Sequence, residues 1–364
     1  MKIIHWIGID DHAEKLTIAH FVDGDAPVHG FEVVPDEKGL RKLLAYLKGL
    51  SGEVRVVYEA GPCGFALYRR LGKAGIRCDV AAPSLTPFKP GDRVKTNRRD
   101  AEKIAKAARA NQLTYITVPA ENQEAMRDVV RGREAVLRRV VALRNQITKL
   151  LLRYGIRYRD GRAWTKKFWS WLGNVTIPSE DTKFVLDELI VALRADLEQM
   201  ERYDQRIEAA ARLEQNAPYV AALRTLRGVD TLAAMTILVE LGDLRRFASA
   251  PQLMAALGVV PAEYSTGNKT NRFAITKMGN AHVRRVLIES AWNYTRRTAE
   301  GRTIRARRKD KPAAVVEIAR KCDLRLNRKY HRMTGRGKPA TVAVVAIARE
   351  LAGFIWAIGQ IAHP

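Results

Sequence analysis

Three acidic residues stand where regular elements are expected to begin or end. Asp10 closes the apolar run IIHWIGID, Glu59 closes VRVVYE, and Asp100 opens a helical segment after the basic stretch RVKTNRR. Carboxylate oxygens are the hard ligands that Mg²⁺ and Mn²⁺ prefer. A pair of such ions can cut a phosphodiester, because one activates the attacking oxygen and the other stabilises the leaving oxygen. The three acids therefore predict a metal-dependent site for phosphodiester chemistry.

Each acid also has a purely structural explanation, which the sequence leaves open. Asp10 could be a turn residue beside Asp11, and Glu59 could be a solvated strand end. Asp100 could serve as a helix N-cap, because Asp is among the preferred capping residues. The metal-site hypothesis therefore depends on the three acids lying together in a strongly basic chain.

The charge of the chain indicates a polyanionic partner. The 364 residues include 63 Lys and Arg against 39 Asp and Glu, which gives a formal net charge of +24. An excess of this size favours binding to phosphate backbones. A solvated surface is the alternative for any single cation. The cations expected to bind nucleic acid flank Asp100 or follow residue 268, and they are Arg93, Lys95, Arg98, Arg99, Lys269, Arg272, Lys277, Arg284 and Arg285.

Cysteine usage and hydropathy predict a soluble cytoplasmic protein without a membrane segment. Cys63, Cys78 and Cys322 lie far apart and lack the spacing of zinc ligands. Acidic residues appear within the first ten positions, too early for a secretory signal peptide. No apolar run is expected to reach the roughly 20 residues that span a bilayer.

Three segments differ in their periodicity. Residues 1–118 predict an α/β domain, with strands at 3–9, 16–21, 54–58 and 77–81 and helices at 38–50, 65–74 and 100–109. Residues 119–215 carry two heptad stripes that predict a helical, coiled-coil connector, packed on itself or on a second copy. Residues 216–364 are helical again and strongly basic, which predicts a mainly α C-terminal domain.

An aromatic and basic stretch separates the two heptad stripes. It contains Trp164, Phe168, Trp169 and Trp171 beside Lys166 and Lys167. Aromatic rings among cations are typical of sites that stack on RNA bases. A small core between the two helices explains the same pattern equally well.

Several motifs resemble those of one protein family. GID, YEAGPCGF and KTNRRDAEK resemble the N-terminal DEDD, RuvC-like domain of the IS110/IS1111 transposases. LRGVDTLAAMTILVELGDLRRF, LGVVPAEYSTGNKTNRFAITKMGNAHVRRVLIESAW and GKPATVAVVAIARELAGFIWAI resemble the second domain of that family, more closely in its IS1111 branch. The resemblance implies a RuvC/RNase H-like fold for the N-terminal domain. It also implies a DNA transposase or recombinase, and it covers nearly the whole chain.

The resemblance implies a specific acidic site with one departure. Asp10, Glu59 and Asp100 match three of the four family acids, which hold Mg²⁺ or Mn²⁺. The fourth family Asp is replaced here by Asn97. An amide offers an oxygen ligand without negative charge, so we expect weaker metal binding. Either this copy is weakened, or three acids suffice, or the change was introduced to trap a complex.

A nucleophilic serine and an RNA guide are the other implications. The family combines its acidic site with a serine from the C-terminal domain, and Ser265 is the better match, with Thr266 as the alternate. We expect both in a tight loop over 263–268, allowed to turn by Gly267. A serine hydroxyl needs activation by a base or a metal, so the two domains would have to come together.

The resemblance also suggests partners and leaves two alternative functions open. The partners are donor and target DNA, a structured guide RNA encoded by the element, and further copies of the chain in a dimer or tetramer. One alternative is a RuvC-like metal-dependent nuclease such as a Holliday-junction resolvase, with a structural Ser265. The other is a nucleic-acid-binding protein whose catalytic site has decayed through Asn97.

Overall fold

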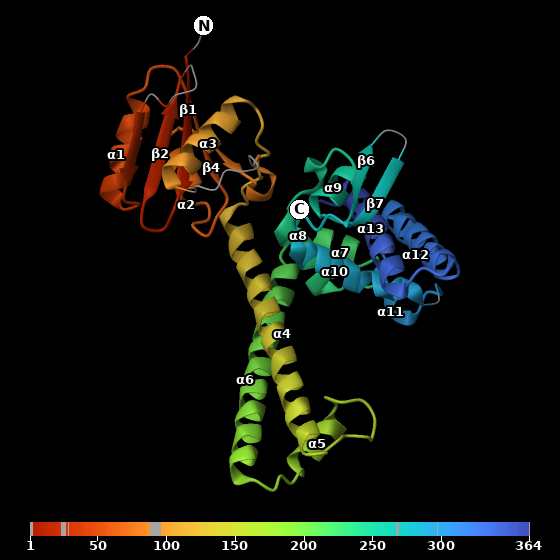
Figure 1. Cartoon of the computed structure of the whole chain (residues 1–364). Coiled ribbons are helices and arrows are strands. Elements are labelled where there is room, and N and C mark those ends of the chain that lie inside the picture. The colour runs from red at the N-terminus through yellow and green to blue at the C-terminus, as the bar shows by residue number, and fades with distance from the viewer. Residues whose placement is uncertain are drawn as a thin grey trace. The chain divides into compact units, whose positions relative to one another are not determined.

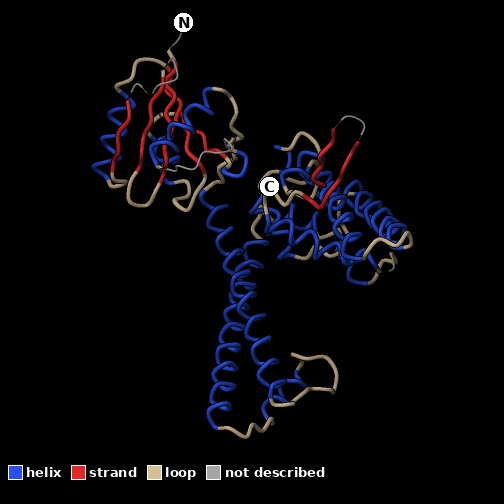
Figure 2. The backbone as a smooth tube through the Cα atoms, viewed as in Figure 1, coloured by secondary structure: helices blue, strands red, loops and turns tan. Residues whose placement is uncertain are grey.

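The computed structural model describes residues 3–22, 27, 29–87, 96–266, 269–296 and 298–363. The chain divides into two compact units, unit 1 (Met1–Pro119) and unit 2 (Ala120–Pro364). Unit 2 includes both the segment expected to be a connector and the segment expected to be a C-terminal domain. Figure 1 shows the elements of each unit, and Figure 2 shows strands in unit 1 and in one hairpin of unit 2.

Unit 1 contains a five-stranded mixed sheet in the order β3-β2-β1-β4-β5. The strands are β1 (Ile4–Asp11), β2 (Leu16–Phe21), β3 (His29–Val33), β4 (Glu53–Glu59) and β5 (Arg77–Ala81). β1, β4 and β5 run parallel, whereas β2 and β3 are added antiparallel to their neighbours. The expected alternation of strands and helices is confirmed, and β3 is an addition to the expected strands.

Helices cover both faces of this sheet. They are α1 (Glu37–Lys48), α2 (Ala66–Lys73) and α3 (Asn97–Arg109), with a short 3₁₀ turn at Pro83–Leu85. Leu43 of α1 and Leu71 of α2 pack with Ile7 and Ile9 in one cluster. The opposite face packs against α3, where Ile104 contacts the cluster that contains Val57.

Unit 2 begins with two long helices, α4 (Glu121–Arg153) and α6 (Glu180–Ala211), joined through α5 (Lys166–Gly173). The pair is antiparallel (Figure 1), and Arg133 reaches Asp204 at 2.9 Å while Arg139 reaches Asp196 at 2.6 Å. The apolar stripes are buried within this pair. Their fully buried members include Val136, Val140, Ile147, Leu186 and Leu193. Intramolecular packing therefore already accounts for much of the two stripes.

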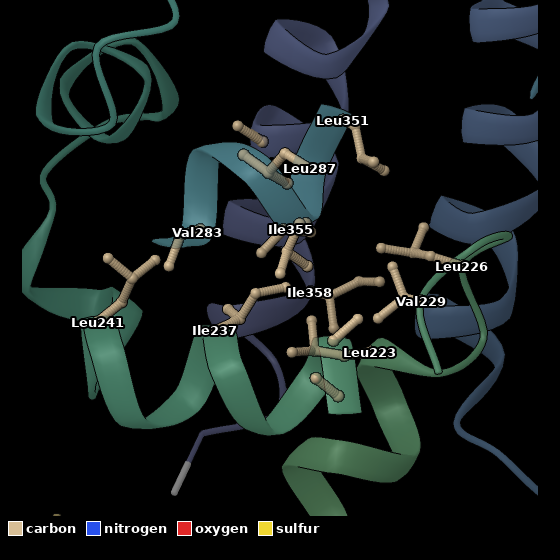
Figure 3. Packing of buried hydrophobic residues seen from close by; sticks show 14 of the residues in the cluster. Leu223, Leu226, Val229, Ile237, Leu241, Val283, Leu287, Leu351, Ile355 and Ile358 are labelled. Carbon is tan, nitrogen blue, oxygen red and sulfur yellow. The ribbon is translucent and has the colours of Figure 1, made fainter. Parts of the chain in front are cut away.

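The remainder of unit 2 is a helical bundle interrupted by a hairpin. Its helices are α7 (Ala217–Leu223), α8 (Thr231–Leu241), α9 (Ala250–Ala256), α10 (Ala281–Ala291), α11 (Arg302–Arg308), α12 (Ala313–Thr334) and α13 (Ala340–Gly359), with 3₁₀ turns at Leu244–Arg246 and Trp292–Thr295. The hairpin comprises β6 (Pro261–Thr266) and β7 (Lys269–Ile275). Figure 3 shows side chains of α7, α8, α10 and α13 converging in the bundle core.

Helix α13 corrects one expectation. It has 20 residues, and its most apolar 18-residue window has a mean hydropathy of 1.8, so its length and composition would allow it to cross a membrane. The sequence had predicted no segment of this kind. Half of its most apolar window is buried inside the protein, and Val344, Ile347, Leu351 and Ile355 belong to the bundle core. Its apolar character is therefore explained by its central place in that core.

Candidate functional site

Asp10 and Glu59 lie at the same edge of the unit 1 sheet. β1 and β4 are adjacent and parallel, and Ile9 is paired in register with Tyr58. The next residue on each strand is the acid, and Glu59 is the last residue of β4. Because parallel strands place their carboxyl ends at one edge, the two acids occupy neighbouring positions there.

Both acids share the sheet face that α3 covers. A Cβ added to Gly8 would lie 2.1 Å from the carbonyl oxygen of Ala101, so Gly8 faces α3. Val57 packs in a cluster with residues of α3 and faces it too. Side chains alternate along a strand, so Asp10, two residues after Gly8, and Glu59, two after Val57, are on this same face.

Helix α3 brings its first turn toward the same edge. Ala101 packs against Gly8, whereas Lys106 lies farther along the helix and over the ring of Phe21, 5.4 Å from its centroid. Phe21 pairs with Trp6, which precedes Gly8 on β1, so α3 runs toward the start of β1. Its N-terminus is therefore nearer the carboxyl end of β1.

Asn97 and Asp100 occupy the first turn of α3. Thr96 caps the helix by accepting a hydrogen bond from the backbone N–H of Arg99 at 3.3 Å. Asn97 and Asp100 are three residues apart, so they share one face of the helix, and both are half-buried. Local capping and the close contact at Gly8 thus determine where this turn lies.

The donor chemistry of these residues suits a divalent cation, but their side chains are not gathered around one point. Among the described residues, no three His, Cys, Asp or Glu side chains lie close enough to hold a metal ion. Asp10, 13% exposed, instead has an oxygen 3.2 Å from Nδ1 of His12. The backbone therefore aligns the acids at one edge, while the side-chain positions are not those of an assembled metal centre.

Asp11 and Cys63 lie beside this edge and were not predicted to be part of the site. The Cys63 thiol donates to the backbone carbonyl of Asp11 over 3.5 Å. Burial raises the pKa of the Asp11 carboxyl, an effect that Cys63 and His12 only partly offset. The only sequence signal for a second acid here was that Asp11 follows Asp10 directly. Because side chains alternate along a strand, Asp11 faces the opposite side of the sheet from Asp10.

Ser265 and Thr266 correct the expected loop. Both belong to β6, where they pair with Thr270 and Lys269 of β7. Residues 267 and 268, which include the expected turn glycine, lie outside the described residues. The two hydroxyl residues are exposed as expected, but they lie on a strand of a hairpin and not in a tight loop over 263–268.

Ser265 already has an acidic neighbour. Its hydroxyl donates to Oε1 of Glu263 at 2.8 Å, and Arg272 donates from Nε to Oε2 of the same carboxylate at 3.1 Å. The hydrogen bonds from Ser265 and Arg272 lower the pKa of Glu263. A carboxylate with a lowered pKa is a weak proton acceptor, so Glu263 orients the hydroxyl better than it activates it.

The basic residues proposed for nucleic-acid contact differ in their exposure and in their partners. Arg93 and Lys95 lie outside the described residues, as does the side chain of Lys269. Arg99 and Lys277 are exposed. Arg98 and Arg272 are also exposed, and each pairs with a neighbouring carboxylate at 3.1 Å, from Glu102 and Glu263 respectively.

Arg284 and Arg285 are engaged inside unit 2. Arg284 donates to the carbonyl of Leu257 at 2.9 Å. Arg285 reaches Glu134 of α4 at 3.3 Å and Glu289 of its own helix at 2.9 Å. These contacts hold α10 in place, so a contribution to phosphate binding would require breaking them.

Two family models match the chain. One, described as a transposase of the DEDD IS110 type, matches residues 7–156, and one described as "Transposase IS116/IS110/IS902 family" matches residues 220–306. A protein of Sinorhizobium fredii named as a transposase, y4qE, is 41% identical over 329 residues, which is 90% of this chain and 81% of the relative. The chain belongs to the IS110 family of transposases.

Two further relatives agree with this assignment. The transposase for insertion sequence element IS1533 of Leptospira borgpetersenii is 30% identical, over 93% of this chain and 99% of the relative. A family 20 transposase of Pseudomonas aeruginosa is 29% identical, over 81% of each chain. For this family member, the matched segments include Asp10, Glu59, Asn97 and Asp100 in the first model and Ser265 in the second.

Proposed function

We propose that this transposase cuts and rejoins DNA strands with an acidic site in unit 1 and a nucleophilic serine in unit 2. The observation that carries the acidic site is the register of β1 and β4, which puts Asp10 and Glu59 side by side under the first turn of α3. Membership of a transposase family makes DNA the substrate of this chemistry.

Asp10, Glu59 and Asp100, with the amide oxygen of Asn97, would hold Mg²⁺ or Mn²⁺. The bound ion would supply an activated oxygen nucleophile and charge stabilisation for the leaving oxygen. The chain itself contributes three negative charges at one edge of a packed sheet. The side chains have to move closer together to form such a centre, and the exposed His12 has to release Asp10.

Ser265 is proposed as the residue that attacks DNA. Its oxygen would form a bond to the phosphorus, the hydroxyl proton would pass to a base, and the displaced sugar oxygen would leave as a hydroxyl by taking a proton. The hydrogen bond to Glu263 at 2.8 Å supports this role because it fixes the direction of the Ser265 hydroxyl. Arg272, held by the same carboxylate and paired in register with Glu263, would contact the DNA phosphate.

Guidance by a structured RNA of the element and assembly into a dimer or tetramer complete the proposal. We also propose that residues 1–118, 119–215 and 216–364 act as three functional parts: acidic site, helical connector and serine-bearing domain. The net charge of +24 supports binding to RNA and DNA together. Competition between the element's non-coding RNA and random RNA of equal length would test the guide.

The deciding experiment compares Ser265→Ala with its neighbour Thr266→Ala. The protein, its element RNA and a junction DNA are incubated with Mg²⁺, and a denaturing gel is examined for a covalent protein–DNA adduct. We expect Ser265→Ala to abolish the adduct while leaving DNA binding unchanged, because the residue is exposed. Thr266→Ala, exposed on the same strand, should retain it.

The other outcomes separate the alternatives. Adduct lost only in Thr266→Ala would assign the nucleophile to Thr266. Adduct in both variants would reject the serine mechanism. Metal-dependent cutting without any adduct would indicate a nuclease with a structural Ser265, and binding alone would indicate a decayed site. Each comparison is repeated in an Asn97→Asp background, because Asn97 itself is expected to reduce activity.

A further inference from the structure

The end of the helical pair that carries α5 is unusually basic. Residues 153–173 contain six cations and a single acid, Asp160. All six cations are exposed. They lie at the last residue of α4, on the loop that follows and on the first turn of α5, at the end of the pair remote from the helical bundle (Figure 1). We call them the tip cations: Arg153, Arg157, Arg159, Arg162, Lys166 and Lys167.

The tip cations differ from the other cations of the same two helices. Along α4, Arg133 and Arg139 pair with acids of α6, and Arg138 pairs with Glu134 at 2.8 Å. Within the described part of the chain, none of the tip cations forms an ion pair with a carboxylate. Like charges held close together repel each other. Arg153 lies over the ring of Tyr154, 5.7 Å from its centroid, which leaves its charge in place. A surface that keeps six cations without carboxylate partners focuses a positive potential outward.

The nearby acids do not neutralise this surface. Asp160 is within the loop, and Glu180 and Asp181 begin α6, which is joined to the end of α4 by a 2.7 Å hydrogen bond between Tyr154 and Thr182. All three acids are exposed and none pairs with a tip cation. The first turn of a helix favours acids by itself, which explains Glu180 and Asp181 without reference to the tip.

The aromatic side chains of the same region are already engaged. The rings of Trp164 and Phe168 are 4.6 Å apart, and those of Tyr158 and Trp171 are 5.1 Å apart. Arg144 covers the ring of Trp164 at 5.2 Å, and in the same way Arg194 covers Trp169 at 5.7 Å. Phe168 is buried in the core of the helical pair. The rings therefore form a small core, the second of the two explanations that the sequence allowed.

This packing limits which ligand the tip can take. Binding of unpaired nucleotides depends on aromatic rings that stack on bases, and here the rings face each other and the guanidinium groups. The exposed groups are Arg and Lys side chains, which contact phosphates and carry no sequence information by themselves. Lys166 and Lys167 begin α5, whose start is capped by Thr165, which accepts from the N–H of Phe168 at 3.3 Å.

We propose that the tip cations bind the phosphate backbone of duplex DNA without reading its sequence. The site would hold DNA at the end of the helical pair that carries α5, and it includes neither the acids of unit 1 nor Ser265. Binding can be measured without cleavage. Failure of the serine mechanism and failure of this site therefore give different results.

The test measures binding of the full-length protein to a fluorescent, random-sequence DNA duplex by anisotropy over a range of salt concentrations. The variant Arg157→Ala/Arg159→Ala/Arg162→Ala removes three tip cations. The control Arg332→Ala/Arg336→Ala/Lys338→Ala removes three exposed cations near the junction of α12 and α13. Circular dichroism and thermal unfolding of both variants should match those of the native protein, because the three residues substituted in each variant are exposed.

We expect the tip variant to bind the duplex about tenfold or more weakly, and its slope of log K against log salt to be smaller by about two to three. The control should change both quantities much less. Equal effects in the two variants would overturn the proposal, since total charge would then explain binding. Loss of affinity only for single-stranded DNA or for RNA would overturn it as well. An unchanged affinity in the tip variant would also reject it.

Discussion

Asp10 and Glu59 lie at the carboxyl ends of two adjacent strands inside a five-stranded sheet, whereas Ser265 lies on the arm of an exposed two-stranded hairpin. The acids are positioned by packing, because α3 meets the sheet through Gly8 and buried alanines. The serine has no core beneath it. The acids of unit 1 should therefore be sensitive to substitutions that disturb packing, and Ser265 to substitutions that remove polar contacts at the base of its hairpin.

The base of the β6–β7 hairpin has the packing contacts with the bundle that its arms lack. Gly258 precedes it and Gly279 follows it, and both adopt positive φ, +63° and +98°. A Cβ on Gly279 would lie 1.9 Å from the carbonyl oxygen of Ala256, so the two ends of the hairpin segment approach closely. Asn280 then caps α10 and donates to Glu240 at 2.7 Å. Polar contacts near the base therefore anchor Ser265 to the bundle.

The largest effect should come from breaking the packing that positions the acids. Gly8→Val places a side chain where Ala101 O and Ala105 N would lie 2.1 and 2.7 Å from its Cβ. We expect α3 to be forced off the sheet and unit 1 to lose about 4 to 5 kcal/mol or more of unfolding free energy. Urea unfolding measures this loss.

Gly72→Ala is the control, because a Cβ at this helical glycine would meet nothing within 4 Å. It should leave the stability of unit 1 unchanged or slightly higher. A Gly8→Val protein as stable as the native one would show that α3 does not rest on β1 as described. The acids would then be held by something other than packing.

The second effect concerns the polar anchor of the hairpin. The side chain of Glu240 is fully buried, accepts from Arg131 at 2.7 Å and lies 3.7 Å from Arg127. Burial would raise the pKa of Glu240, but hydrogen bonds from Arg131 and Asn280 outweigh it and lower the pKa. Glu240→Gln should destabilise unit 2 by about 3 kcal/mol, because it leaves Arg127, whose side chain is 15% exposed, without its carboxylate.

Asp187→Asn is the matched control for Glu240→Gln. It also removes one negative charge, from the exposed pair with Lys183 at 2.8 Å. An exposed i,i+4 pair contributes about 0.3 to 0.5 kcal/mol. Similar losses in the two variants, measured by urea unfolding, would mean that the base of the hairpin is not anchored through Glu240.

The same comparison explains what the sequence could and could not predict. Unit 1 shows the clear periodicities of strand and helix, so β2 and β5 have the expected bounds and the other predicted strands and helices differ by a few residues. β3 was missed because it is an edge strand, mostly exposed, and it forms through pairing with β2. The β6–β7 hairpin was missed because its arms are exposed and carry no apolar alternation.

The roles of individual charges were harder to predict than the elements. Arg284 and Arg285 follow the serine segment and look like phosphate ligands, yet their partners are Leu257 and Glu134, on other elements. A sequence shows which residues are charged but not which distant carboxylate or carbonyl they meet. The alignment of Asp10 with Glu59 was better predicted, because both lie at the carboxyl ends of strands that are parallel.

The third effect is on stability: lowering the pH should destabilise unit 1 and unit 2 over different pH ranges. On the sheet face opposite α3, His20 Nε2 lies 2.9 Å from His5 Nδ1, and His20 Nδ1 lies 2.7 Å from the Tyr46 hydroxyl. The Ser51 carbonyl near His5 Nε2 can only accept, so protons on His5 Nε2, on His20 Nε2 and on the Tyr46 hydroxyl satisfy every bond in this row. Burial, His5 and His29 lower the pKa of His20 to about 4.

Because the pKa of His20 is depressed from 6.5, the stability that its neutral form contributes is complete above pH 6.5 and is lost as the pH falls toward 4. The loss amounts to roughly 3 kcal/mol. In unit 2, the partners of Glu134 lower its pKa to about 2, so its contribution is lost only below about 4.5. As the pH falls, unit 1 should therefore lose stability before unit 2.

His20→Gln should flatten the pH dependence of the unfolding free energy of unit 1 between pH 6.5 and 4, measured by urea unfolding. An unchanged slope would exclude His20 as the source of this pH dependence.

The smallest effect concerns Asn97 and tests whether the first turn of α3 belongs to the metal site. Asn97→Asp restores a fourth acid on the helix face that carries Asp100. An added carboxylate should tighten Mn²⁺ binding by about tenfold, or about 1.4 kcal/mol. The same charge also favours the helix N-terminus by about 0.3 to 1 kcal/mol without any metal. Thermal unfolding with EDTA measures the helix contribution alone, and calorimetry with Mn²⁺ measures the metal contribution. A variant stabilised in EDTA but with unchanged Mn²⁺ affinity would leave Asn97 as a helix residue only, and the acidic site would then consist of Asp10, Glu59 and Asp100.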